Sequence, residues 1–161
     1  MSTDQPDAVA WAAWATRLAD AVTGLAPDGS VTVTGPAGSA RPVRLRKARL
    51  GGFIPAKHDV VTPWVRLVRT DDLLRGQCVG AELMGAHFPL SPDEDAALLA
   101  LGWHRPSPLE GEDYLRFWPD DVPQGPFLPR DEADRAAAMV AVTFREVLAV
   151  DAADLPLVDG P

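Results

Sequence analysis

Cysteine and long hydrophobic runs are both scarce in this sequence, and each scarcity excludes a class of protein. The only cysteine, Cys78, excludes an intramolecular disulfide framework and a zinc site built from several cysteines. The longest apolar run, Ala8–Ala15, is far too short to cross a bilayer. Asp4 and Asp7 stand where a secretory signal would carry basic residues, so we expect a cytoplasmic protein with no membrane partner.

Basic residues are also fewer than acidic residues in this sequence. The 161 residues hold 15 Lys and Arg against 23 Asp and Glu, a formal net charge of −8, which disfavours a nucleic-acid coat protein or a basic membrane-surface helix. With 47% hydrophobic residues, the chain has the size and balance of one globular domain. We expect this domain to span residues 1–150 and to be followed by a flexible tail at residues 151–161.

Short-range catalytic and metal-binding motifs are missing as well. The sequence has no Gly-x-Ser-x-Gly elbow and no Walker A loop, and its histidines (His58, His87 and His104) form no pair at metal-ligand spacing. Cys78 lies in an apolar stretch, where a free cysteine is typically a small buried hydrophobe. The sequence therefore predicts no catalytic residue, no metal and no cofactor, while an enzyme whose site is assembled across loops stays an alternative.

Apolar residues recur every three or four positions between Pro6 and Leu25, which predicts an amphipathic helix. Trp11 and Trp14 lie one turn apart on its apolar face and form what we call the tryptophan ridge. One interpretation is that the ridge packs on a sheet. The other is that it forms a partner or dimer surface, because a helix at the edge of a small domain can leave such a ridge partly bare.

The rest of the chain predicts an antiparallel sheet followed by two helices and a short aromatic strand. Ser91, Pro92 and Glu94 form a capping box before the first of these helices, and Gly102 supplies its left-handed end. The acidic residues of its first turn are better explained by capping than by metal binding. The predicted strands are 30–34, 43–47, 64–69, 73–80 and 114–118, and the predicted helices are 92–101 and 131–150.

Residues 41–75 form a basic segment inside this acidic chain, with nine basic residues against three acidic ones. Arg44 and Arg46 lie on its first strand, and Trp64 with Arg66 could extend the same surface. Pairing with the acidic helices is the interpretation that we favour, since surfaces of mixed charge are the norm. An acidic peptide, a nucleic acid or a partner strand added to a sheet edge would suit the same residues.

A family resemblance becomes visible once the C-terminal half is laid out. Leu90-Ser91-Pro92, then Leu101-Gly102-Trp103 and Pro106, and a closing helix ending in Phe144–Leu148 resemble the actinobacterial TY-Chap families. These are predicted peptide-binding, chaperone-like domains related to type III secretion chaperones and YbjN proteins. The resemblance is best over residues 64–150. The chain departs from the pattern at residues 40–59, an added basic strand and loop, and by showing one strand instead of two between the last helices.

The resemblance implies an α+β fold of two layers, in which an antiparallel sheet packs against two or three helices as in type III secretion chaperones. It implies a noncatalytic domain that binds a partner polypeptide as a chaperone or adaptor, often as a homodimer, without a cofactor. A nucleic-acid-binding accessory protein that uses residues 41–49 and a structural subunit of a larger assembly remain the alternatives. The candidate partner-binding residues are Trp11, Trp14, Arg44, Arg46, Trp64 and Arg66.

Overall fold

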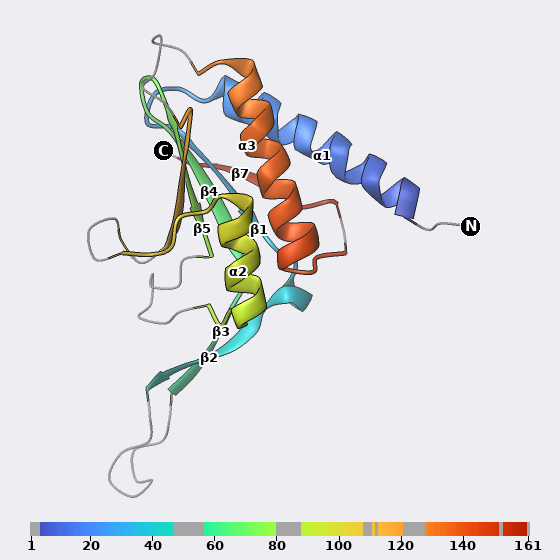
Figure 1. The fold of residues 1–161 in the computed structure, drawn as a ribbon, viewed down its shortest axis with the longest axis vertical. Coiled ribbons are helices and arrows are strands. Elements are labelled where there is room, and N and C mark those ends of the chain that lie inside the picture. The colour runs from blue at the N-terminus through green and yellow to red at the C-terminus, as the bar shows by residue number, and fades with distance from the viewer. Residues whose placement is uncertain are drawn as a thin grey trace, which may run out of the picture.

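A five-stranded antiparallel sheet with three α-helices forms the body of the protein in the computed structural model (Figure 1), which confirms the predicted α+β class. The structure describes residues 4–46, 57–79, 88–107, 111, 113–120, 128–151 and 153–160. The strand order in the sheet is β6-β5-β4-β1-β7. The strands are β1 (Ser30–Thr34), β4 (Trp64–Arg69), β5 (Leu74–Cys78), β6 (Tyr114–Trp118) and β7 (Leu157–Gly160), and the helices are α1 (Asp4–Gly24), α2 (Pro92–Leu101) and α3 (Arg130–Val142).

All three helices lie on the same side of the sheet (Figure 1). Strand side chains alternate between the two faces, and those that point toward the helices form the core. Val31 and Val33 of β1 and Val65 and Leu67 of β4 are each 0% exposed. The β-branched sequence of β1 suits such a strand, since branched side chains pack well on a pleated surface. The fold therefore has two layers, with one face of the sheet buried under helices.

Helix α2 begins and ends as its sequence predicts. The backbone N–H of Glu94 donates to Ser91 Oγ, and the Glu94 carboxylate accepts from the backbone N–H of Ser91, which completes the capping box. Gly102 ends the helix in the left-handed conformation, with φ of 101°. Trp103 then turns back into the core, where its Nε1–H donates to Thr143 Oγ1 over 3.0 Å. These contacts confirm the predicted capping box, in which Glu94 is the acidic residue that takes part.

The predicted helix 131–150 has a less regular C-terminal end than its sequence suggests. Helix α3 ends at Val142 and continues as a π-helical segment, Thr143–Val147. The Thr143 hydroxyl donates to the carbonyl oxygen of Met139 and accepts from Trp103, so its side chain competes for helix hydrogen bonds at the change of pitch.

The basic segment and the C-terminal residues correct two of our expectations. Strand β2 (Arg41–Arg46) does not join the main sheet; it pairs with β3 (Lys57–Val61) in a separate two-stranded ribbon that projects from the body (Figure 1). The predicted flexible tail is wrong at its end, because Leu157–Gly160 forms edge strand β7 and pairs antiparallel with β1. The pairing partner lies more than a hundred residues away in the chain, so local sequence carried no signal for it.

Gly76 of β5 generates a test of the packing between the sheet and the tryptophans. A Cβ atom at Gly76 would lie 2.8 Å from the ring of Trp118 and 3.2 Å from the ring of Trp103. We expect Gly76→Ala to lower the free energy of unfolding by roughly 1–3 kcal/mol, as overpacked cores do. Urea denaturation measures this loss. Gly38→Ala is the matched control, since a Cβ there meets nothing within 4 Å; equal stability of the two variants would contradict the packing argument.

Candidate functional site

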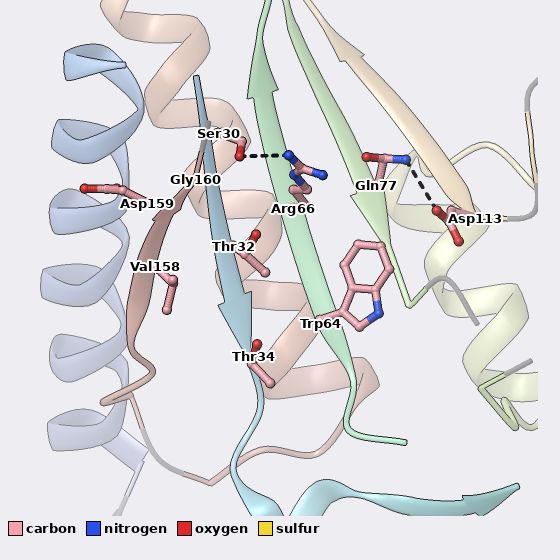
Figure 2. A pocket seen from close by; sticks show the side chains of 10 residues that line it. All are labelled: Ser30, Thr32, Thr34, Trp64, Arg66, Gln77, Asp113, Val158, Asp159 and Gly160. Carbon is pink, nitrogen blue, oxygen red and sulfur yellow. Dashed lines mark hydrogen bonds between the residues drawn. The ribbon is translucent and has the colours of Figure 1, made fainter. Parts of the chain in front are cut away.

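The face of the sheet that points away from the helices carries a groove, which we call the open-face groove (Figure 2). Its volume is about 610 Å³, and strands β1, β4, β5 and β7 all contribute to it. The alternation of strand side chains places most of the lining side chains here, because their sequence neighbours point into the core; Asp159 borders the groove although its side chain points away from it. The groove is lined by Ser30, Thr32, Thr34, Trp64, Arg66, Gln77, Asp113, Val158, Asp159 and Gly160.

Two apolar side chains flank the hydroxyl-rich floor of the groove. Trp64 is half-buried at the start of β4, directly opposite Thr34, and its indole ring stands on the open face (Figure 2). Val158 of β7 lies on the other side, opposite Thr32, with 56% of its surface exposed. Apolar side chains that keep part of their surface accessible beside a concave polar floor are typical of a site that binds another molecule.

Polar contacts hold the charged side chains of the groove in place. The Arg66 guanidinium donates to Ser30 Oγ over 3.1 Å, which orients it across β1 (Figure 2). Gln77 Nε2 donates to Asp113 Oδ2 over 3.4 Å at the opposite end of the groove. The groove therefore offers an aromatic plane, hydroxyls, an amide and a guanidinium, which together can bind both the backbone and the side chains of a polypeptide.

Trp64 and Arg66 are thus brought together by the structure, on the same face of one strand. That they contact a partner stays a prediction. Sequence reasoning missed the other groove residues, although the polar positions of β1 carried a signal: Thr32 and Thr34 alternate with the buried Val31 and Val33.

The tryptophan ridge does not form the surface that one interpretation assigned to it. Trp11 is 2% exposed and Trp14 is 0% exposed, with their rings in an edge-to-face contact at 5.6 Å between centroids. The Nε1–H of Trp14 donates to the carbonyl oxygen of Leu155 over 3.0 Å. Both side chains belong to the core, because α1 packs them beneath α3 and the C-terminal segment. The assignment of the ridge to partner binding is therefore wrong.

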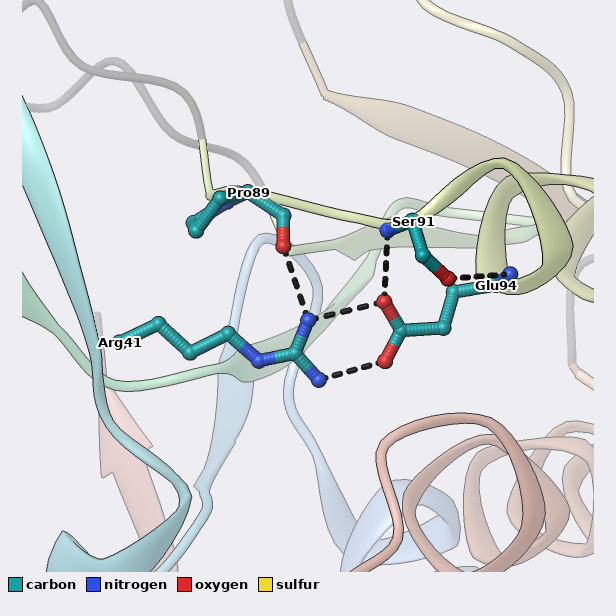
Figure 3. A network of polar contacts seen from close by, with 4 residues as sticks. All are labelled: Arg41, Pro89, Ser91 and Glu94. Atoms are coloured by element: carbon teal, nitrogen blue, oxygen red, sulfur yellow. Dashed lines mark hydrogen bonds and ion pairs between the residues drawn. The ribbon is translucent and has the colours of Figure 1, made fainter.

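Arg41, the first residue of the basic segment, is paired inside the domain (Figure 3). Its two terminal nitrogens donate to the two oxygens of the Glu94 carboxylate over 2.8 and 2.5 Å, and one also donates to the Pro89 carbonyl. The guanidinium carbon lies 4.8 Å from the ring centroid of Phe88. This geometry confirms, for Arg41, the predicted pairing with an acidic helix and ties β2 to the start of α2.

The backbones of Arg44 and Arg46 pair with His58 and Lys57 of β3, and the side chains of these four residues lie outside the part that the structure describes. His87 also lies outside it. Cys78 is fully buried, and burial raises the pKa of its thiol well above its ordinary value, which favours the packing role expected for it. Across the described ranges, no group of three or more His, Cys, Asp or Glu residues could hold a metal ion.

Comparison with known proteins identifies the family. Residues 4–155 match the family TY-Chap3, described as "T3SS (YopN, CesT) and YbjN peptide-binding chaperone 3". The chain belongs to this family. The match runs from α1 through the π-helical segment, well beyond the residues 64–150 where the sequence resemblance was best, and it ends just before β7. Neither a curated protein nor a solved structure matches the chain significantly.

TY-Chap3 is described as a family of peptide-binding chaperones, which supports the expected binding of a protein or peptide. The helices that the structure describes are all too short or too polar to span a membrane.

The pair of Arg41 and Glu94 generates a prediction about acid stability. Hydrogen bonds from Arg41 lower the pKa of Glu94 to about 2, from an ordinary value of 4.5. The pair therefore stabilises the fold above about pH 4.5, and this contribution is lost as the pH falls toward 2. We expect Glu94→Gln, which keeps the capping geometry, to cost about 1–2 kcal/mol at pH 7 and almost nothing at pH 2.

Urea denaturation between pH 7 and pH 2 measures this difference. Asp93→Asn is the matched control, because Asp93 is an exposed carboxylate in the same helical turn. A Glu94→Gln deficit of the same size at every pH would show that the ion pair is not its cause.

Proposed function

We propose that this TY-Chap3 domain is a noncatalytic chaperone or adaptor that holds an extended segment of a partner polypeptide in the open-face groove. The observation that carries the proposal is the groove itself: in a member of a family described as peptide-binding, the face of the sheet away from the helices is hollowed and lined with groups suited to peptide binding. The groove crosses four strands, so it can contact several consecutive residues of a segment laid over it.

Several side chains of the groove have specific roles in this proposal. The indole of Trp64 packs against an apolar side chain of the partner, and Thr32 and Thr34 hydrogen-bond to its backbone. Arg66, already oriented by Ser30, binds a carbonyl or carboxylate of the partner. Tryptophan is enriched among the few residues that dominate the binding energy of protein interfaces, so Trp64 is the residue on which affinity depends most.

The basic segment contributes less to this proposal than the sequence suggested. Arg41 is engaged by Glu94 and by the Pro89 carbonyl, so its charge is balanced inside the domain. Arg44 and Arg46 remain candidates for contact with an acidic partner. The homodimer and the cytoplasmic location also stay predictions, and light scattering on the purified protein checks the first.

Substitution of Trp64 tests the proposal. We expect Trp64→Ala to lower the affinity for the partner by about 30-fold, the effect of roughly 2 kcal/mol from losing a buried tryptophan contact. The partner is first recovered by copurification from the native host with nuclease treatment, and its binding segment is then titrated by calorimetry. Thr32→Arg, which fills the groove floor without removing core packing, is expected to abolish the same binding.

Val60→Ala is the matched control, because Val60 is also apolar and 64% exposed but lies on the projecting ribbon. Thermal unfolding establishes that each variant is folded. If folded Trp64→Ala and Thr32→Arg both retain full affinity, the groove is not the binding site. Recovery of nucleic acid in place of a protein, lost on nuclease treatment, would overturn the proposed function as a whole.

A further inference from the structure

Strand β7 is the strand of the main sheet that lies outside the residues matched by the family. The TY-Chap3 match ends at residue 155, and β7 begins at Leu157, so the strand lies beyond the shared domain. Leu155 is anchored: it is 4% exposed, and its carbonyl accepts the Nε1–H of Trp14. Pro156 then joins this anchor to the strand. The anchored Leu155 and the one-residue linker Pro156 thus place β7 beside β1.

The fit of β7 against β1 is incomplete. Leu157 and Asp159 are the two side chains of β7 on the core side, opposite Val33 and Val31, which are both fully buried. Leu157 packs against the core, but Asp159 is an exposed carboxylate at a position where the neighbouring strand carries only apolar side chains. In Figure 2 the Asp159 side chain points away from the groove, toward the side of α1. Only one of the two core-side positions of β7 therefore contributes an apolar side chain to the core.

We propose that β7 is a built-in competitor, which occupies the edge of β1 until an extended segment of a partner replaces it. The replacing segment carries apolar side chains at both core-side positions, those of Leu157 and Asp159. It carries glycine at the position of Gly160, because a Cβ there would lie 2.9 Å from Ser30 Oγ. This inference rests on the proposed function in that the partner is a polypeptide, and it adds how the partner gains access to the sheet.

The exchange follows from the energetics of a short edge strand. β7 has four residues, pairs with β1 alone in the described sheet, and leaves Val158 and Asp159 exposed, so little apolar area is lost when it separates. The replacing segment makes the same backbone hydrogen bonds to β1 as β7 does, and it buries one more apolar side chain than β7. Replacement also alters the proposed binding groove, since Val158 and Gly160 form one of its walls.

A peptide made from the strand itself provides the probe. A fluorescein-labelled peptide of residues 153–161 that carries Asp159→Val is titrated into the full-length protein, with the unaltered 153–161 peptide as the matched probe. We expect the Asp159→Val peptide to bind about tenfold more tightly than the unaltered one, the gain from burying one valine side chain. Anisotropy measures both affinities.

The same substitution placed in the protein has the opposite effect. Asp159→Val in the full chain strengthens β7, so we expect it to weaken binding of the Asp159→Val peptide by about tenfold. Asp154→Val is the matched control: it makes the same chemical change at a carboxylate that is 95% exposed and lies outside β7. It is expected to leave the affinity unchanged.

A reversible disulfide between β1 and β7 tests whether peptide binding requires the release of β7, separately from any change in the groove. Thr32 and Val158 are directly opposite each other, so Thr32→Cys with Val158→Cys can link β1 to β7 by a disulfide, and the native Cys78 is too buried to interfere. We expect the reduced protein to bind the peptide and the oxidised protein to lose binding.

Equal peptide affinity in the oxidised and reduced proteins would overturn the competitor role of β7. If Trp64→Ala still weakens binding of the natural partner in that case, the proposed function stands without a competitor role for β7. If neither the peptide nor any partner binds any folded variant, both proposals fail together.

Discussion

The burial of one face of the sheet is the constraint on which the rest of the structure depends. Val31, Val33, Val65 and Leu67 are fully buried on the core side of strands β1 and β4, and α1, α2 and α3 all lie on that side. Helix α1 contacts α3 more extensively than it contacts any strand. The helices therefore act as one layer that closes over the sheet. Since strand side chains alternate, the same burial leaves the opposite side chains uncovered, and that is where the groove lies.

Two tryptophan N–H groups form hydrogen bonds that connect this core to segments far away in the sequence. Trp14 of α1 donates to Leu155 near the C-terminus, and Trp103 after α2 donates to Thr143 at the start of the π-helical segment. Each bond satisfies a donor that would otherwise be costly to bury. Each also fixes the path of a segment: the first sets where β7 starts, and the second holds α2 against the end of α3. The core thus determines the position of the edge strand.

Local signals in the sequence were enough to predict most elements of the fold. The capping box at Ser91 and Glu94, the β-branched residues of β1 and the helical periodicity of α1 each act within a few residues, so they can be recognised in one chain. The elements that were missed depend on distant partners. Strand β7 has only four residues and includes Asp159 and Gly160, which are poor strand formers, and it exists because β1 offers it an edge.

The candidate site shows the same division between local and long-range information. Charge drew attention to Arg66 and Trp64, but only the fold shows that they share a face with Thr32 and a groove with β7. The tryptophan ridge failed as a binding site for the converse reason: an aromatic pair on one helix gives no sign of which element will cover it. Trp11 and Trp14 became core once α3 and the C-terminal segment were packed over them.

The alternation of side chains has a final consequence for binding. Many groove residues are sequence neighbours of core residues, yet their own side chains contribute little to core packing. If the groove binds a partner as proposed, we expect substitutions at Thr32 or Gln77 to change what it binds without disturbing the buried layer. The exception is the edge of β1, where one strand serves both layers. There, any segment that inserts must satisfy the core on one side and the groove on the other. In the proposed binding mode, selectivity for a partner is therefore greatest at this edge, where the groove and the core share a strand.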